Sequence, residues 1–289
     1  MAISLLTVLI ALGLLHLRPQ LARWGGDRPF RQWVRQLGDT GGAGRVVLAL
    51  LLPLALCAAV AWLLGRLPLG ELWQMLFALA VLLYAFGPRE FEADLEAIVQ
   101  APDGLQREAT AQALTEDGET VAWQAAALGE AVAYAALRRR FGVLFWFFVF
   151  GPVGALAYRL GQTLGRDRSL QLDDASAVSA RHVANALDWL PAQLLTLTLA
   201  VVGHWEAVIG AWRRWHAQAA TNSWYAVGPG FLGAAARADA LSDIEGGDGY
   251  AEDRTDPLAE LVRLRSALLR ALLAWLSVVA LIVIGGWVA

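Results

Sequence analysis

Long apolar runs alternate with shorter polar stretches along the chain, and this alternation is the strongest pattern in the sequence. A membrane-spanning helix needs roughly 20 mainly apolar residues, with a range of about 17–25. Six stretches approach or reach that length, namely residues 2–17, 46–64, 72–86, 141–160, 189–209 and 268–288. The pattern predicts an all-α fold, a polytopic membrane helix bundle with about 4–6 transmembrane helices in one integral membrane domain over residues 1–289.

Composition agrees with a membrane protein. Hydrophobic residues make up 57% of the 289 positions and charged residues 17%, whereas soluble domains average about 45–50% and about 25%. The surplus apolar surface is expected to face the lipid bilayer. A net charge of −3 is too small to indicate nucleic-acid binding, and none is expected. All 23 Lys and Arg positions are arginine, which excludes Schiff-base lysine chemistry and the lysine of a P-loop.

Arginines orient the predicted spans, because basic loops favour the cytoplasmic side. Residues 18–45 contain six arginines and two acidic residues, which predicts a cytoplasmic basic loop. Residues 87–140 carry three helical patterns and end in three consecutive arginines, which predicts a cytoplasmic or interfacial helical segment. Residues 239–257 are acidic and rich in glycine, which predicts a flexible loop.

One loop disagrees with this orientation. If all six segments cross the membrane, residues 161–188 are periplasmic, yet they contain Arg166, Arg168 and Arg181. Either the 141–160 segment is re-entrant and broken at Gly151–Pro152, or these arginines bind something anionic. The sequence leaves both explanations open.

Ionisable side chains beside aromatic ones mark two places near membrane depth, Tyr158–Arg159 and Asp188–Trp189. Charge at such depth is costly unless it is paired or functional. Arg159 and Asp188 are expected either to pair with each other or to form a site for a charged ligand. The corner Gly87–Pro88–Arg89–Glu90 places a further cation and anion at the mouth of the bundle, although the start of a surface helix is an alternative reading.

Residues 141–195 also carry an ordered set of motifs. They read L-F-W, then G-P-x-G-A-L-A-Y-R followed after three residues by T-L, then N-x-L-D-W-x-P-A. This set resembles the inner-membrane family that joins AmpE, which is tied to β-lactamase induction, with CobD/CbiB, an adenosylcobinamide-phosphate synthase. The resemblance covers residues from about 82 to 211. It implies a multi-pass protein of the bacterial inner membrane, and it leaves homo-oligomer formation open.

The synthase branch attaches aminopropanol phosphate to adenosylcobyric acid as an amide, and its motifs carry acidic and amide side chains that this chain lacks. The matching positions here are Tyr134–Ala135, Leu137–Arg138, residues 162–166 (QTLGR), Ala184–Asn185 and Gln193. The resemblance therefore implies the AmpE branch, and we expect a signalling modulator of cell-wall stress rather than an enzyme. It would bind an anionic ligand, such as a muropeptide or a lipid-linked precursor, in the bundle. An amide-forming synthase and a carrier of an anionic amphiphile are the alternatives.

The candidate ligand-binding residues come from the matched blocks and the charged corner: Arg89, Glu90, Tyr158, Arg159, Thr163, Asp188 and Trp189. The sequence assigns no catalytic residue, no metal ligand and no cofactor.

Overall fold

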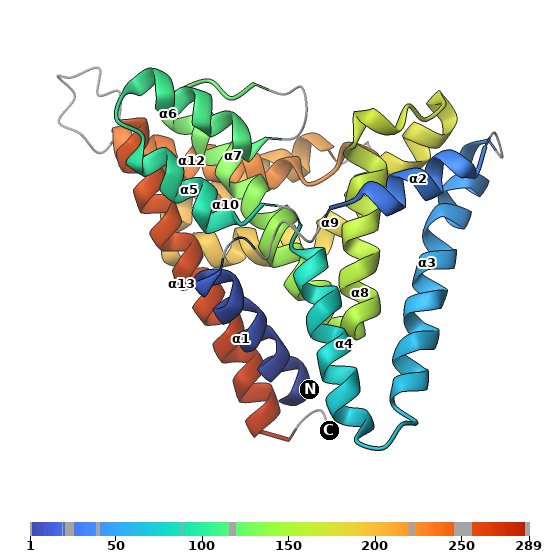
Figure 1. The fold of residues 1–289 in the computed structure, drawn as a ribbon. Helices are drawn as coiled ribbons and strands as arrows, with labels where there is room; N and C mark the ends of the chain where they lie inside the picture. The colour runs from blue at the N-terminus through green and yellow to red at the C-terminus, as the bar shows by residue number, and fades with distance from the viewer. Residues whose placement is uncertain are drawn as a thin grey trace. The chain divides into compact units, whose positions relative to one another are not determined.

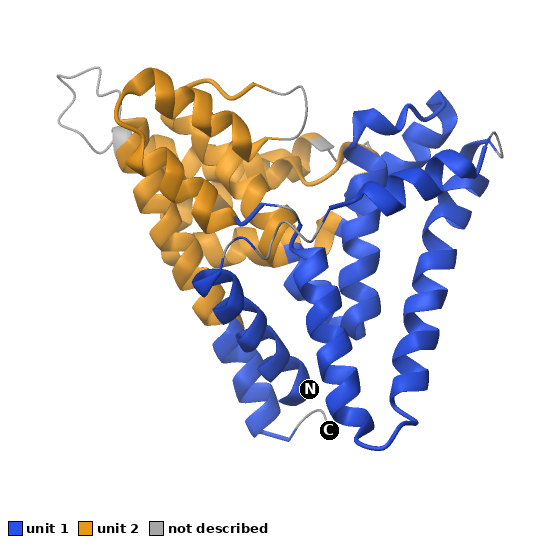
Figure 2. Ribbon diagram, viewed as in Figure 1, with its two compact units in different colours: residues 1–90, 142–187, 276–289 blue, residues 91–141, 188–275 orange. Residues whose placement is uncertain are grey.

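All regular structure in the described part of the chain is helical, and no strand occurs there (Figure 1). The computed structural model describes residues 2–18, 20, 26–38, 41–87, 89–115, 120–219, 223–245 and 256–286. The predicted all-α membrane fold is confirmed. Contacts divide the chain into two compact units (Figure 2): unit 1 holds residues 1–90, 142–187 and 276–289, and unit 2 holds residues 91–141 and 188–275.

Four helical runs are long and apolar enough to cross a membrane: Gly42–Leu64, Ala125–Arg166, Asp174–Val202 and Pro257–Ile284. Two shorter apolar helices, Ala2–Leu17 and Gly70–Ala85, coincide with two more of the predicted stretches. The predicted 189–209 stretch was placed wrongly, because its helix begins at Asp174 and ends at Val202.

Unit 1 is built mainly from apolar helices. On α3 the side chains of Leu51, Leu52 and Leu56 are 61%, 51% and 62% exposed in the single chain. Exposed apolar surface of this extent is expected to face lipid. The unit contains α1 (Ala2–Leu17), α2 (Arg28–Gln36), α3 (Gly42–Leu64), α4 (Gly70–Ala85), α8 (Gly142–Arg166), η4 (Arg168–Leu170), α9 (Asp174–Val202) as far as Leu187, and α13 (Pro257–Ile284) from Leu276.

The helix α8 is broken in its middle. Phe150 and Gly151 have non-helical backbone angles, and Gly151 lies at φ 63° and ψ −149°. That conformation is open essentially to glycine alone. Pro152 follows at the start of the second limb, where its missing N–H removes no helical hydrogen bond. The Gly151–Pro152 pair therefore ends one helical limb and begins another.

The two limbs of α8 run antiparallel. A Cβ added to Gly154 would collide with the carbonyl oxygen of Trp146, and one added to Gly142 would collide with the ring of Tyr158. In a straight helix these pairs would lie about 12 Å and about 24 Å apart along the axis. The first limb is continuous with the helical residues before it, in a run that begins at Ala125. Residues 142–166 therefore form a helical hairpin that reverses at Gly151.

The hairpin bears on the disagreement over the arginines of residues 161–188. If it is re-entrant, both of its ends lie on one side of the membrane. The segment after α8 contacts the basic segment 18–45 directly: Arg31 Nε lies 2.7 Å from Asp167 Oδ2, and Arg35 Nη2 donates to the Ser169 carbonyl oxygen over 3.3 Å. The two arginine-rich segments therefore lie against each other, and the positive-inside rule predicts that they share one side of the membrane.

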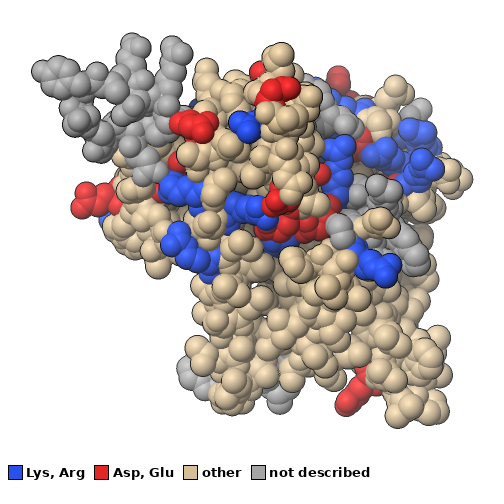
Figure 3. Space-filling view, turned by 60° about the vertical axis from the view of Figure 1, so that its left-hand side comes forward, with Lys and Arg blue, Asp and Glu red and all other residues tan. Residues whose placement is uncertain are grey.

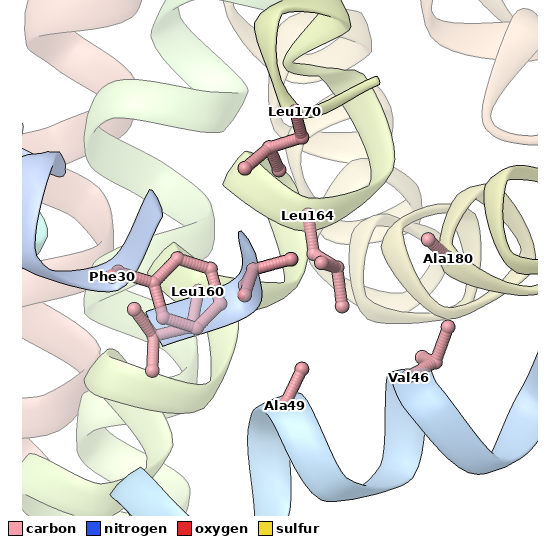
Figure 4. Packing of buried hydrophobic residues seen from close by; sticks show 8 residues of the cluster. Phe30, Val46, Ala49, Leu160, Leu164, Leu170 and Ala180 are labelled. Atoms are coloured by element: carbon pink, nitrogen blue, oxygen red, sulfur yellow. The ribbon is translucent and has the colours of Figure 1, made fainter. Parts of the chain in front are cut away.

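Segment 18–45 is not simply a loop, because it contains α2 and the first turn of α3. Phe30 and Val34, one turn apart on α2, are buried in a hydrophobic cluster that fixes this helix to α3, α8 and α9 (Figure 4). The cluster consists of Phe30, Val34, Val46, Ala49, Leu160, Leu164, Leu170 and Ala180.

Unit 2 packs shorter helices around α7 and α12. The three helical patterns predicted within residues 87–140 correspond to α5, α6 and α7. The prediction of a loop over residues 239–257 was partly wrong, because α12 continues to Glu245, while residues 246–255 lie outside the described part of the chain. Besides parts of α9 and α13, the unit contains α5 (Phe91–Gln100), α6 (Gly104–Ala111), η2 (Gln112–Leu114), α7 (Ala125–Ala136), the π-helical turn η3 (Leu137–Phe141), α10 (Trp205–Ala219), α11 (Trp224–Val227) and α12 (Gly230–Glu245).

Candidate functional site

In unit 1, Arg159 on the second limb of α8 binds Asp27, the residue before α2. Arg159 Nη2 donates to Asp27 Oδ2 over 2.5 Å, and Arg159 Nε donates to Asp27 Oδ1 over 3.3 Å. The hydroxyl of Tyr84, near the end of α4, donates to Asp27 Oδ1 over 3.1 Å. The side chains of Asp27 and Arg159 are 6% and 17% exposed, so the pair is largely shielded from water. Three elements far apart in sequence thus meet at one buried ion pair.

The other predicted residues of unit 1 lie on α8 and at the corner after α4. Tyr158 is fully buried, with its ring against Gly142 of the first limb. Thr163 donates from its hydroxyl to the carbonyl oxygen of Arg159 over 3.1 Å, which ties it to its own helix. In the charged corner, Arg89 is exposed and Glu90 is partly buried.

A second polar group in unit 1 joins α8 to α9. Gln162 donates to the carbonyl oxygen of Ala184 over 3.1 Å, and Arg166 donates to Gln162 over 2.7 Å and to the Asn185 side chain over 3.2 Å. Gly165 brings the helices close, since a Cβ there would lie 2.6 Å from the Ala180 carbonyl oxygen. These are positions at which the chain departs from the synthase motifs, yet they remain polar and mutually bonded.

In unit 2, Asp188 on α9 is fully buried, and its Oδ2 lies 3.9 Å from Nε of Arg138. Arg138 belongs to η3, a π-helical turn of a kind often found at functional sites. Its guanidinium carbon also lies 5.1 Å from the centre of the Tyr134 ring. The expected partner of Asp188 was Arg159, which lies in unit 1; that pairing stays a prediction, while each residue has a partner within its own unit.

Trp189 lies in an aromatic cluster on the adjoining face of α9. Its ring centre is 5.1 Å from that of Phe231 and 5.4 Å from that of Trp224. One turn further along, Gln193 accepts a hydrogen bond from Trp212 Nε1 over 2.7 Å and lies 3.2 Å from Nε2 of His216. Gln193 stands where the synthase motif has an arginine. Both the oxygen and the nitrogen of its side-chain amide therefore have a partner in the structure.

Acidic groups come together in unit 2 from outside the matched motifs. Glu92 binds Arg140 through one oxygen and Arg265 through the other, each over 2.9 Å. Glu96 accepts from Arg265 over 2.6 Å, and this bond is the main cause that lowers the pKa of the Glu96 carboxyl. Arg139 binds Asp94 over 2.7 Å. In Figure 3, arginine and carboxylate side chains gather in the upper part of the face, and the lower part is largely uncharged.

Sequence reasoning missed Asp27 and Tyr84 and undervalued the acidic group on α5. In the sequence, Asp27 was noted only as one of the two acidic residues of the basic segment 18–45. An Asp directly before a helix with proline at its start is nevertheless a recognisable N-cap signal. Among the described residues, no three His, Cys, Asp or Glu side chains form a group suited to a metal ion.

Comparison with known proteins favours the CobD branch over the AmpE branch. The chain is 33% identical over 220 residues to cobalamin biosynthesis protein CobD of Chromobacterium violaceum, covering 72% of this chain and 66% of that protein. It is also 33% identical over 178 residues to cobalamin biosynthesis protein CobD of Stutzerimonas stutzeri, covering 56% of this chain and 54% of that protein. The chain is a homologue of CobD proteins. This relationship is consistent with the CobD/CbiB family, although the chain spans less than two thirds of either CobD relative.

No family model matches the chain, and no solved structure matches it. The CobD relatives overturn the expected AmpE-type signalling function and the expectation that the chain is not an enzyme. That expectation rested on side chains missing from short motifs. The polar groups described above show that substituted positions can keep a bonded polar environment, and that carboxylates can come from other helices.

Proposed function

We propose that the chain is an amide-forming enzyme of cobalamin biosynthesis, of the adenosylcobinamide-phosphate synthase type, in the bacterial inner membrane. The observation that carries this proposal is the 33% identity to a CobD protein over 72% of the chain. In this proposal the basic segment 18–45 faces the cytoplasm, where its arginines agree with the positive-inside rule.

The reaction joins the amine of aminopropanol phosphate to a carboxyl group of adenosylcobyric acid. A carbon–nitrogen bond forms, a carbon–oxygen bond of the carboxyl group breaks, and that oxygen must leave on an activating co-substrate. Both substrates carry an anionic group, and the chain has no lysine, so arginine is the cationic side chain available to bind phosphate and carboxylate groups. Arg159 and Arg166 in unit 1 and Arg138 in unit 2 are therefore the first candidates for substrate contact.

Three groups of residues support the proposal by their chemistry. Arg159 with Asp27 supplies a held guanidinium, and Arg166 with Gln162 and Asn185 supplies a second polar group in the same unit. In unit 2, the carboxylate of Asp188 beside Arg138 is buried among helices that carry aromatic side chains. Buried, paired charges of this kind near membrane depth are typical of functional sites.

Genetic complementation tests the proposed function. A strain lacking its adenosylcobinamide-phosphate synthase should regain cobalamin-dependent growth when it expresses this chain, and the Arg159→Ala variant should not restore it. Membranes holding the full chain should form adenosylcobinamide phosphate from both substrates and a nucleoside triphosphate, as measured by mass spectrometry. The exposed position Glu71 provides a control, since Glu71→Gln should behave like the wild type. Absence of both growth and product at confirmed membrane expression would reject the function.

A further inference from the structure

Asp27 is the N-cap residue of α2, yet its side chain makes no hydrogen bond to the first turn of that helix. Asp at an N-cap usually accepts from a backbone N–H of that turn. Here both carboxylate oxygens turn instead to Arg159 and Tyr84. The Asp27 carboxylate therefore binds the Arg159 guanidinium instead of stabilising the first turn of α2.

Asp27 binds only part of the Arg159 guanidinium, and the rest can bind another ligand. Asp27 binds the edge formed by Nε and Nη2, and in the part of the chain that the structure describes no hydrogen-bond partner lies on Nη1. A two-point contact holds the planar group in one orientation, which a single contact does not. The two N–H groups of Nη1, with the second N–H of Nη2, are thus the donors that Asp27 does not use.

The backbone of Gly87 lies close to Nη1 of Arg159. The residue follows α4 at φ 88°, and a Cβ there would lie 3.0 Å from Arg159 Nη1 and 3.2 Å from its guanidinium carbon. Glycine is the residue that adopts this φ without strain. The backbone at Gly87 therefore approaches the guanidinium closely, near Nη1, the guanidinium carbon and Nη2.

From these contacts we infer that Nη1 of Arg159 binds an oxyanion of the substrate, a phosphate or a carboxylate, and that Asp27 and Tyr84 are positioning residues for it. This inference rests on the proposed function. Asp27 and Arg159 together carry no net charge, so binding depends on the direction of the N–H groups rather than on attraction to a free cation. Loss of Asp27 therefore weakens binding even though it makes the site more positive.

Steady-state kinetics on the full chain in detergent tests the inference. Asp27→Asn should raise KM for one substrate by about tenfold, the value of one charge-assisted hydrogen bond, with little change in kcat. Tyr84→Phe should raise the same KM by a smaller factor. If the affected substrate is aminopropanol phosphate, the oxyanion is a phosphate; if it is adenosylcobyric acid, the oxyanion is a carboxylate.

Asp167→Asn is the matched control, because Asp167 is similarly buried, at 7% exposure, and pairs with Arg31 over 2.7 Å in the same unit. It should leave both KM values unchanged. Unchanged KM values in Asp27→Asn, or equal rises in the control, would overturn the inference.

A second measurement separates this inference from the proposed function. Inorganic phosphate or acetate, added alone, should raise the melting temperature of the wild type and of Asp167→Asn but not that of Asp27→Asn. If the wild type shows this effect and no synthase activity, only the proposed function fails. If neither anion stabilises the wild type and no KM depends on Asp27, the oxyanion site is rejected.

Discussion

Gly154 lies directly against the carbonyl oxygen of Trp146, eight positions earlier in the same helical run. Only a chain reversal brings these residues together, and only a residue without Cβ fits there. The G-P-x-G motif therefore has a structural reading: Gly151 turns the chain, Pro152 begins the second limb, and Gly154 lets the limbs touch.

Replacement of Gly154 by leucine should destabilise the protein strongly. The new side chain meets backbone atoms of the first limb, which cannot move aside as a flexible side chain can. We expect a loss on the order of 3 kcal/mol or more, at the upper end for overpacked sites, measured by thermal unfolding in detergent. Gly13→Ala is the control, because nothing lies within 4 Å of a Cβ there. Equal melting temperatures for Gly154→Leu and the wild type would contradict the hairpin.

Cysteine labelling should place the two arginine-rich segments on one side of the membrane. In a Cys57→Ala background, cysteines at Gln32 and Ser169 should share one response to an impermeant maleimide in intact cells. A cysteine at Leu69, which is 76% exposed in the turn between α3 and α4, should show the opposite response. Shared behaviour of Ser169 and Leu69 would mean that α8 crosses the membrane.

Mutant cycles should reveal the partner of Asp188. Removing the buried Asp188 carboxylate leaves Arg138 without this counter-ion, at a cost of about 3–5 kcal/mol for a buried pair. Replacing both residues by apolar ones of similar volume should cost less than replacing Asp188 alone. Thermal unfolding of the single and double variants measures the coupling. A parallel cycle on Arg159 and Asp188 tests the pairing predicted from sequence, and strong coupling there would support it.

Acid should weaken the contacts of Glu96. Hydrogen bonds from Arg265 and Gln100 lower its pKa below the ordinary value of 4.5. Its contribution to stability is therefore present above the unfolded-state value and is lost as pH falls through the lower folded-state pKa. The Glu96→Gln variant should lose less stability than the wild type when the pH is taken below about 4.5. Glu71→Gln, on exposed surface, should follow the wild-type curve. Parallel curves for wild type and Glu96→Gln would contradict the role of this carboxylate.

Local signals predicted much of the architecture. Apolar length located most of the helices that could span a membrane, while the misplaced arginines and Gly151–Pro152 left a re-entrant segment and an anion site both open. The ion pair of Arg159 was not predictable in the same way, because Asp27 lies 132 positions away and the sequence offers no local cue to their meeting. Helix boundaries such as that of α9 also depend on packing, which carries this helix through Pro191 without ending it.

The functional prediction went wrong for a related reason. Missing acidic and amide residues in short motifs were taken as missing chemistry. Yet a binding site is lined by side chains from several helices. Glu92 on α5 lies outside every matched block, and it binds Arg140 and Arg265. A motif read along one helix does not include such groups.

If α8 is re-entrant, its two antiparallel limbs do not change the side of the membrane on which the following residues lie. Lengthening or shortening both limbs alters how deep Phe150 reaches without inverting anything that follows. Loss of a helix that crosses the membrane would instead move every later loop to the opposite side. The depth that Phe150 reaches can therefore change without any change in the orientation of the other helices.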